Sequence, residues 1–138
     1  MSYDDNNVFA KILRDELPAH RVFEDEHTLA FMDVMPQVDG HTLVIPKQPA
    51  ENLFDVAPEV LGATIQTVQR VGAAVQSAFA APGIMIAQLN GPAAGQTVFH
   101  LHFHILPRHD GVEFGMHARD MADQALLAEH AERIRAAL

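Results

Sequence analysis

The first half of the chain alternates short apolar segments with polar turns. A short helix is predicted at residues 6–14, because Asn6 or Asn7 can cap its start and the apolar side chains that follow fall on one face. Apolar runs between turn residues then predict three strands, at 22–25, 28–32 and 41–45. Pro46 is predicted to stop the third strand.

A long helical pattern opens the second half. Pro58 suits the first position of that helix, and the Pro82–Gly83 pair ends it. Its apolar face is predicted to comprise Leu61, Ile65, Val68, Val71 or Gly72, Val75 and Phe79. Two further strands are predicted at 84–87 and 98–106, the second closed by Pro107. A last amphipathic helix, from about Asp120, is predicted to bury Leu127, Ala131, Ile134 and Leu138.

These elements do not alternate as regular strand–helix–strand units. The pattern therefore predicts an α+β fold, in which an antiparallel sheet of about five strands carries the long helix and the C-terminal helix. The 138 residues suit a single domain, with a motif-bearing core at about 6–109 and a helical tail at about 111–138. An open sheet has a free edge, which dimerisation could cover.

Charge and composition exclude several classes of protein. The net charge of −9, from 18 acidic and 9 basic residues, argues against a nucleic-acid polymer as partner but leaves a small phosphate ligand open. The absence of cysteine excludes disulfides, thiol nucleophiles and cysteine zinc sites. No apolar run approaches the ~20 residues of a membrane span, and residues 1–7 do not resemble a signal peptide. We therefore expect a cytoplasmic protein that does not enter a membrane.

The densest chemical signal lies in the last predicted strand. Residues 100–105 alternate histidine with apolar side chains, so a strand would place His100, His102 and His104 on one face and the apolar set in the core. Three explanations fit this pattern. The histidines could be polar residues on the wet face of an edge strand, a zinc site of the His-x-His type, or a centre for nucleophilic catalysis.

The segment before the histidines favours phosphate over metal. Residues 90–97 combine glycines, which let the backbone approach a ligand closely, with the side-chain donors of Asn90, Gln96 and Thr97. Arg108, just after the predicted strand, could add a positive charge or simply be solvated.

Taken together, these segments resemble the histidine-triad family. Residues 95–108 resemble its signature, in which three histidines alternate with apolar residues. Four earlier segments look like the family's N-terminal blocks in the same order, at 9–12, 23–25, 30–33 and 41–47. The resemblance covers about residues 6–109. It implies a HIT-like fold, purine nucleotide binding, and hydrolysis or transfer at an α-phosphate.

The resemblance also implies a role for each histidine. His102 would be the nucleophile that attacks phosphorus, giving a covalent nucleotidyl-histidine that water then releases. His104 and loop amides would hold the non-bridging oxygens, while His100 and His41 would orient His102. The contacts to the phosphate and the leaving group would come from Asn90, Gly95, Gln96 and Thr97.

The family's nucleoside site has counterparts nearer the N-terminus. Asp33 matches the carboxylate that accepts both ribose hydroxyls. The apolar base pocket is matched by Val8, Phe9, Ile12, Phe31 and Val34. Simpler readings remain open: the apolar residues as plain core, Asp33 as a turn residue, and His41 as a surface residue. No signal attaches to the remaining histidines that we expect in solvent: His20, His27, His117 and His130.

The chain departs from some relatives at one feature. Many bacterial members carry a zinc ion on a Cys-x-x-Cys pair, a later histidine and the first histidine of the triad. The matching positions here hold Asn7, Ala10 and Pro49, so we expect neither structural zinc nor any other cofactor. The resemblance further implies a homodimer. The tail after Gly111 has no family counterpart, which leaves the choice of substrate open.

The leading hypothesis is a phosphoramidase or nucleotide hydrolase with a small leaving group, for which adenosine phosphoramidate is the natural test substrate. Residues 90–97 also resemble the loop of the dinucleoside polyphosphate hydrolases, so that activity remains an alternative. A non-catalytic nucleotide-binding regulatory protein and a zinc hydrolase using the same histidines are further alternatives.

Overall fold

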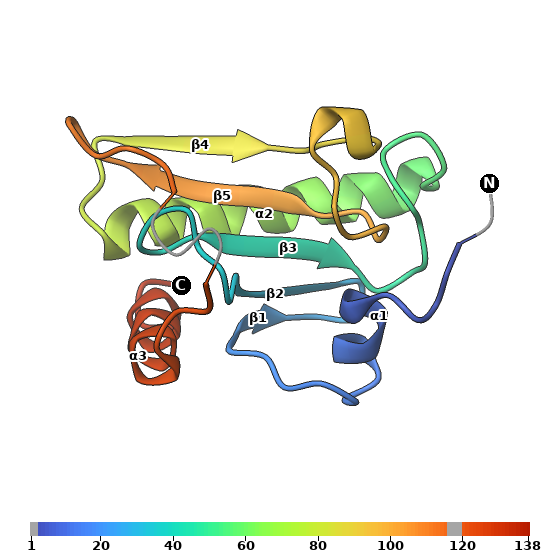
Figure 1. The fold of residues 1–138 in the computed structure, drawn as a ribbon, viewed down its shortest axis with the longest axis horizontal. Helices are drawn as coiled ribbons and strands as arrows, with labels where there is room; N and C mark the ends of the chain where they lie inside the picture. Colours follow the sequence, from blue (N-terminus) through green and yellow to red (C-terminus); the bar gives the residue numbers. More distant parts are fainter. Residues whose placement is uncertain (1–2, 116–119) are drawn as a thin grey trace.

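A five-stranded antiparallel sheet organises the chain (Figure 1). The structure is a computed structural model that describes residues 3–115 and 120–138. The strand order across the sheet is β1-β2-β3-β5-β4, and every neighbouring pair is antiparallel. The strands are β1 (Arg21–Glu24), β2 (Thr28–Met32), β3 (Thr42–Pro46), β4 (Gly83–Ala87) and β5 (Phe103–Arg108). The predicted α+β fold is therefore confirmed.

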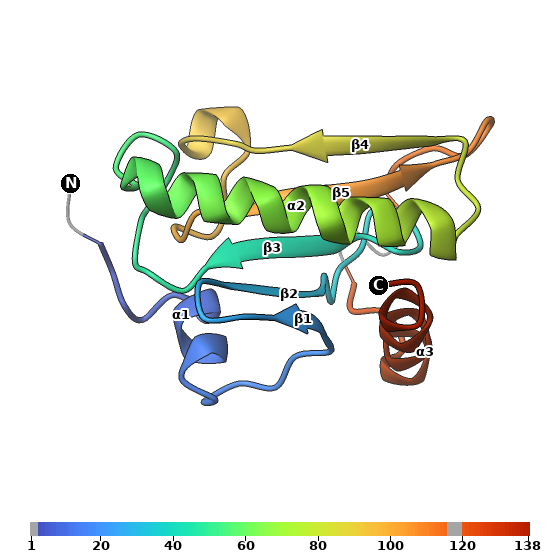
Figure 2. The ribbon, with the colours of Figure 1, turned by 180° about the vertical axis from the view of Figure 1, so that it is seen from behind.

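In the part of the chain that the structure describes, three α-helices and one 3₁₀ turn complete the fold. They are α1 (Val8–Leu13), α2 (Pro58–Ala78), η1 (Pro92–Ala94) and α3 (Gln124–Arg135). Figure 2 shows α2 lying across one face of the sheet, with α3 beside β1 and β2. Asn7 caps α1 and Asp123 caps α3, each through its side-chain oxygen. Among the described residues, no helix has the length and apolar composition that a membrane span requires.

The strands β2 and β3 are buried on both faces, and each face of the sheet has its own core. Every residue of β2 and β3 is buried. On the α2 side, Val44 packs with Val71 and Val75 of the helix. On the other side, α1 covers a smaller core made of Phe9, Ile12, Leu29, Phe31, Leu43 and Ile45. Since side chains alternate along a strand, the same two strands feed both cores.

The last sheet strand begins later than predicted. Residues 98–106 were expected, but β5 starts at Phe103, so only His104 of the three histidines lies within it. The reason is a change of partner, because the Leu101 amide donates to the carbonyl of Ala50 at 2.8 Å instead of to a neighbouring strand. The apolar half of the pattern is nevertheless correct, since the core on the α2 side contains Leu101, Phe103 and Ile105.

Of the two prolines that were predicted to end strands, Pro46 does end its strand and Pro107 does not. Pro46 is the last residue of β3 and pairs with Thr28, while Pro107 lies within β5 and pairs with Ile84. A proline removes one donor from the ladder but leaves its own carbonyl able to pair.

Three predictions about helix faces were wrong. Ile65 is 45% exposed, because the buried stripe of α2 runs instead through Thr64, one residue earlier. Leu138 is exposed because α3 ends before it. His130, expected in solvent, is only 4% exposed and packs edge-on against the Phe79 ring at 5.0 Å between centroids.

The remaining histidines outside the triad differ in environment. His27 is exposed as predicted, whereas His20 is half-buried and contacts the side-chain oxygen of Gln124 at 2.8 Å. The prediction for His117 lies outside the described residues.

Gly40 shapes the turn that delivers His41 to the sheet. Its φ of +87° lies in the left-handed region that favours glycine. A Cβ at this position would stand 2.8 Å from Cε2 of Phe79 and 3.0 Å from Cγ of Pro107. Both the backbone conformation and the space therefore require glycine.

We predict that Gly40→Ala lowers the free energy of unfolding by roughly 2–4 kcal/mol, from the sum of positive-φ strain and overpacking. The matched control is Gly62→Ala in α2, where a Cβ meets nothing within 4 Å. That change should raise stability by about 0.5–1 kcal/mol, because glycine disfavours a helix interior. Urea unfolding of both variants checks this, and equal effects would contradict the assignment to Gly40.

Candidate active site

A cavity of about 570 Å³ opens on the sheet face that carries α1. Its walls come from α1, from the end of β2, from the loop before β5 and from the C-terminal segment. The predicted site residues that line it are Val8, Phe9, Ile12, Phe31, Asp33, Val34, Gly95, Thr97, His102 and His104. The structure therefore brings together the predicted nucleoside residues and two of the three triad histidines.

Four other lining residues carried no signal of a binding site in the sequence. Leu17, Pro18 and Ala19 extend the wall beyond α1, and Met121 reaches the cavity from the C-terminal segment. The Ala122 amide donates to the carbonyl of Val34 at 2.9 Å, which ties this segment to the cavity rim. No local pattern could have predicted these residues, because only the tertiary fold brings them near the histidines. The remaining members are Met32, Met35, Gln37, Leu43, Leu89 and Val98.

His102 presents a free lone pair to the cavity. Its Nδ1 lies 2.7 Å from the carbonyl oxygen of His100. A carbonyl can only accept, so Nδ1 carries the proton and Nε2 is left unprotonated in the neutral ring. Phe9 packs edge-on against this ring, with centroids 5.0 Å apart. Backbone and packing together hold the imidazole with Nε2 available as a nucleophile.

Hydrogen bonds through His41 give His104 the opposite tautomer to that of His102. The Gln37 backbone amide donates to Nδ1 of His41 at 3.1 Å, so the proton of the neutral ring lies on Nε2. That Nε2–H donates to Nδ1 of His104 at 2.9 Å. Nε2 of His104 must then carry a proton, because its Nδ1 is already an acceptor. His104 consequently offers an N–H donor where His102 offers a lone pair, with ring centroids 5.0 Å apart.

His100 lies behind the cavity rather than in its lining. Its ring is fully buried, and Nε2 donates to the carbonyl of Pro46 at 2.8 Å. Nδ1 therefore accepts, and the Tyr3 hydroxyl reaches it at 2.5 Å. His41 likewise lies behind His104 and is 1% exposed, so it is not the surface residue that one simpler reading allowed.

Burial keeps all four rings neutral. Removal from water lowers the pKa of His41 to about 3 and the pKa of His100 to about 4. Desolvation also lowers the pKa of His104 to about 4, with repulsion from His102 adding to it. Burial lowers the pKa of His102 as well, against the stabilising bond to the His100 carbonyl. At neutral pH the His102 ring is therefore uncharged, with its one proton on Nδ1.

Asp33 follows β2 and faces the same histidines. Its carboxylate accepts from the Met35 amide at 2.9 Å, as a turn residue would, and lies 3.5 Å from Nε2 of His41. Burial raises the pKa of Asp33 to about 6, and the Met35 bond opposes that shift. Because His41 is neutral, the contact between them is not an ion pair. Asp33 thus has acceptor capacity left for donors from a ligand.

Two predicted phosphate residues instead hold the loop before β5. The Asn90 side-chain oxygen accepts from the Leu53 amide at 2.9 Å, and its NH₂ donates to Gln88. Gln96 is buried, accepts from the Gly91 amide at 2.8 Å and donates to the Glu51 carbonyl at 2.7 Å. Neither lines the cavity, so both shape the loop that carries Gly95 and Thr97.

One set of side chains in the described part of the chain has the spacing of a metal site. Ligand atoms of Asp33, His41 and His104 lie within 4.8 Å of one another. The donor set is nevertheless unsuited to a cation. A metal at Nε2 of His41 would require a proton on Nδ1, and that proton would face the Gln37 amide, which already donates there. The backbone thus favours a proton over a metal.

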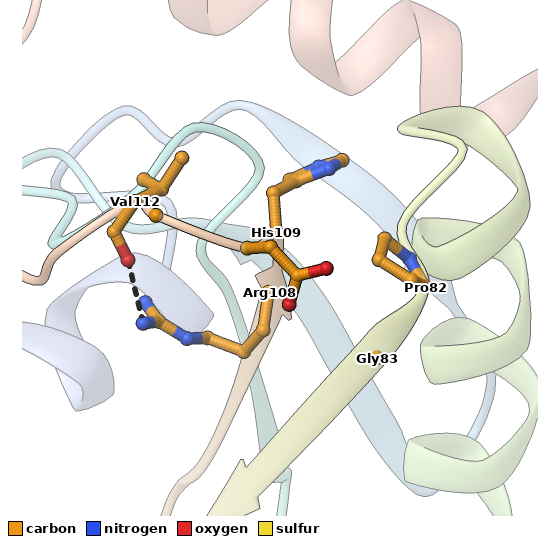
Figure 3. A pocket seen from close by; sticks show the side chains of 7 residues that line it. Pro82, Gly83, Arg108, His109 and Val112 are labelled. Carbon is orange, nitrogen blue, oxygen red and sulfur yellow. Dashed lines mark hydrogen bonds between the residues drawn. The ribbon is translucent and has the colours of Figure 1, made fainter.

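A second hollow, of about 440 Å³, lies at the other end of β5 (Figure 3). The Arg108 guanidinium donates to the Val112 carbonyl at 2.8 Å and lies 3.8 Å from the centroid of the Phe114 ring. Arg108 is therefore neither freely solvated nor near the histidine cavity. It holds the chain that leaves the sheet, and we assign no chemistry to this hollow.

Comparison with known proteins shows extensive similarity. Residues 14–111 match the HIT domain family. A Hit-like protein involved in cell-cycle regulation from Bartonella henselae, crystallised with an unknown ligand, has a TM-score of 0.93 at 50% identity, covering 99% of this chain and 100% of its own. For a hypothetical histidine triad nucleotide-binding protein from Sulfolobus tokodaii strain7, the TM-score is 0.87 at 32% identity, covering 94% and 89%.

A curated relative adds a named activity. Adenylylsulfatase HINT3 of Arabidopsis thaliana is 38% identical over 101 residues, which span 73% of this chain and 51% of that protein.

We predict that acid destabilises the fold. Histidine titrates near 6.5 in an unfolded chain, whereas His41, His100 and His104 have pKa values of about 3, 4 and 4 when folded. The folded protein therefore binds fewer protons between pH 6.5 and about 4, so the free energy of unfolding falls as the pH falls through that window. Asp33, with its pKa raised to about 6, opposes only one of these groups below pH 6.

Thermal melts at pH 7 and pH 5 test this, and the Tm should be lower at pH 5. His41→Gln should show a smaller difference between the two pH values than the wild type. His27→Gln, the same change on an exposed residue, is the matched control. A wild-type Tm that is equal at both pH values would contradict the neutral buried histidines.

Proposed function

The chain belongs to the HIT family, a nucleotide-binding family with many hydrolases, and on that premise we propose that it hydrolyses purine nucleotide conjugates at the α-phosphate through His102. The observation that carries this proposal is the pair of tautomers in the cavity. The free lone pair of His102 stands beside the free N–H of His104, and backbone groups select both states.

This pair suits attack on phosphorus. Nε2 of His102 forms the new bond to phosphorus, and the electron pair of the leaving-group bond departs with the leaving group. The N–H of His104 donates to a non-bridging oxygen, where negative charge grows during attack. Gly95 and Thr97 of the loop line the same cavity, and their amide and hydroxyl donors would bind the remaining oxygens. Since each donor is positioned before the substrate arrives, little reorganisation is needed.

Water then completes the cycle. It attacks the same phosphorus, the bond to Nε2 of His102 breaks, and the ring returns to its neutral state as the nucleoside monophosphate leaves. With a phosphoramidate, the substrate nitrogen carries a proton from solvent and departs as ammonia. Splitting the displacement into two steps lets one histidine serve both as attacking group and as leaving group.

The rest of the cavity suits a nucleoside. Val8, Phe9, Ile12 and Phe31 supply an apolar slot for a planar base. Asp33 lines the same cavity and has two carboxylate oxygens for the two ribose hydroxyls. Ribose donors would favour the charged carboxylate, which offsets the cost of burying it. An adenylyl substrate is supported by the adenylylsulfatase name of the Arabidopsis relative.

We predict that the protein hydrolyses adenosine phosphoramidate and that His102→Ala lowers kcat at least 10³-fold, the order seen when a nucleophile is removed. EDTA should leave wild-type turnover unchanged. Diadenosine tetraphosphate, assayed in parallel, distinguishes a phosphoramidase from a dinucleoside polyphosphate hydrolase. His27→Ala serves as a matched control, because it removes an imidazole from the exposed surface.

Other outcomes have defined meanings. Nucleotide binding without turnover of either substrate would contradict the enzyme and support a regulatory nucleotide-binding protein. Activity abolished by EDTA would contradict metal-free catalysis and support a zinc hydrolase. Faster turnover of the dinucleotide would replace the phosphoramidase assignment but retain the role of His102.

We further propose a homodimer in which two β4 edges face each other. Among the described residues, β4 pairs with a strand on one side only. Its Met85 and Ile86 are 42% and 43% exposed, and Ile65 on the neighbouring α2 is also exposed. An apolar edge with open hydrogen-bonding groups favours association with a like edge.

We predict that Ile86→Lys converts the dimer to a monomer, because it places a charge in the centre of this apolar edge. Light scattering after size-exclusion chromatography measures the mass against the 15.1 kDa of one chain. Phe54→Lys, which alters an exposed apolar residue elsewhere, is the control and should remain dimeric. A monomeric wild type would contradict the proposal.

A further inference from the structure

We propose that Tyr3 is a positioning residue for His102, acting through the ring and carbonyl of His100. The kinetic consequence rests on the proposed function, whereas the hydrogen-bond chain itself does not. Tyr3 precedes every segment that the sequence patterns singled out, and it is the only tyrosine in the chain. It is separated from His100 by 97 positions in sequence, yet its hydroxyl meets Nδ1 of that ring.

The donor and acceptor in each hydrogen bond between Asn7, Tyr3 and His100 are determined first at Asn7. The Asn7 side-chain oxygen accepts from the Ala10 amide at 2.9 Å, which caps α1. The NH₂ group of Asn7 must therefore face the other way, and it donates to the Tyr3 hydroxyl oxygen at 2.9 Å. With that oxygen acting as acceptor, the hydroxyl proton is directed to Nδ1 of His100 at 2.5 Å.

The same donor and acceptor assignment follows independently from the tautomer of His100. Nε2 of His100 meets the Pro46 carbonyl, which only accepts, so Nε2 carries the proton and Nδ1 the lone pair. Tyr3 is the group that supplies a donor to this lone pair. Its ring also packs against the imidazole, with centroids 5.6 Å apart and an angle of 71° between planes. The acceptors at the two ends therefore determine the position of every proton in this series of hydrogen bonds.

This series of hydrogen bonds ends at His102. The His100 carbonyl is the acceptor that holds Nδ1–H of His102 at 2.7 Å and so leaves Nε2 unprotonated. Without the Tyr3 hydroxyl, the fully buried His100 ring would keep a lone pair with no donor. If the proton of His100 moved to Nδ1, the lone pair of Nε2 would face the Pro46 carbonyl oxygen, and both atoms are acceptors. Either response displaces His100 and loosens the acceptor that orients His102.

The same segment controls a second ring contact. Asn7 caps α1, and α1 carries Phe9, which packs against the His102 ring. Residues 3–9 therefore place one aromatic ring on His100 and another on His102. This continuity explains why the N-terminal segment should affect the reacting atom as well as the nucleoside slot.

Tyr3→Phe is the sharpest test, because it removes the hydroxyl and keeps the ring. Protein labelled with ¹⁵N-histidine reports the protonation of each ring nitrogen by NMR. In the wild type we expect the His100 signals to show protonated Nε2 and a hydrogen-bonded, unprotonated Nδ1. In Tyr3→Phe, the His100 Nδ1 signal should shift, and a second tautomer should become populated.

A charge-matched pair supplies a second test. Asn7→Asp keeps an oxygen that can cap α1 but replaces the NH₂ donor with an acceptor, which competes for the Tyr3 proton. Asn6→Asp adds the same charge one residue earlier, at an exposed side chain. Asn7→Asp should reproduce the NMR change of Tyr3→Phe, whereas Asn6→Asp should match the wild type.

Kinetics separate positioning from simple packing. Loss of one oriented hydrogen bond should lower kcat for adenosine phosphoramidate roughly three- to tenfold, with KM unchanged. A segment that only holds α1 would instead raise KM, since α1 lines the nucleoside slot. Unchanged His100 signals in Tyr3→Phe, or a rise in KM alone, would overturn the proposal. If the wild type turns over no substrate, the proposed function fails, while the NMR comparison still decides the role of Tyr3.

Discussion

Burial of imidazoles without charge is the constraint on which this site depends. A neutral histidine has one nitrogen that donates and one that accepts, so each buried ring needs complementary neighbours. Here the backbone supplies the groups that decide: the Gln37 amide for His41, the Pro46 carbonyl for His100 and the His100 carbonyl for His102. These groups cannot change their role with pH. The chemistry that each ring can perform is therefore set by main-chain geometry.

The same constraint gives the histidines of one row different hydrogen-bonding roles. His102 presents a lone pair to the cavity, because its Nδ1 donates to a carbonyl. His104 presents an N–H, because its Nδ1 accepts from His41. A metal would need lone pairs from every ring at once. Backbone groups behind the rings thus favour a nucleophile beside a donor over a set of equivalent ligands.

Much of this arrangement could be predicted from local patterns. The two-residue alternation placed Leu101, Phe103 and Ile105 in the core, and this is correct although β5 begins only at Phe103. Apolar side chains report burial, which depends mainly on their own periodicity. Hydrogen-bond partners depend on which segments meet, so the departure of residues 98–102 from the sheet left no signal. The roles of Asn90 and Gln96 in holding the loop were hidden for the same reason.

The cavity walls show the limit of local reasoning more sharply. Val8, Phe9 and Ile12 belong to one helical face and could be grouped from spacing alone. Met121 lies near them only because the chain after β5 returns across the rim, where the Ala122 amide bonds to Val34. A residue without periodicity or motif becomes visible only in three dimensions.

Sequence separation has a consequence for how the site forms. Three of the bonds that fix the rings join residues 97, 63 and 54 positions apart, and α2 and β4 lie between β3 and β5 in the sequence. Such long-range closures come late in folding, because their loop entropy must be overcome first. A chain still emerging from the ribosome without β5 lacks His104, whose Nδ1 accepts the hydrogen bond from Nε2 of His41. Partly synthesised or partly folded molecules would therefore lack the assembled set of oriented histidines.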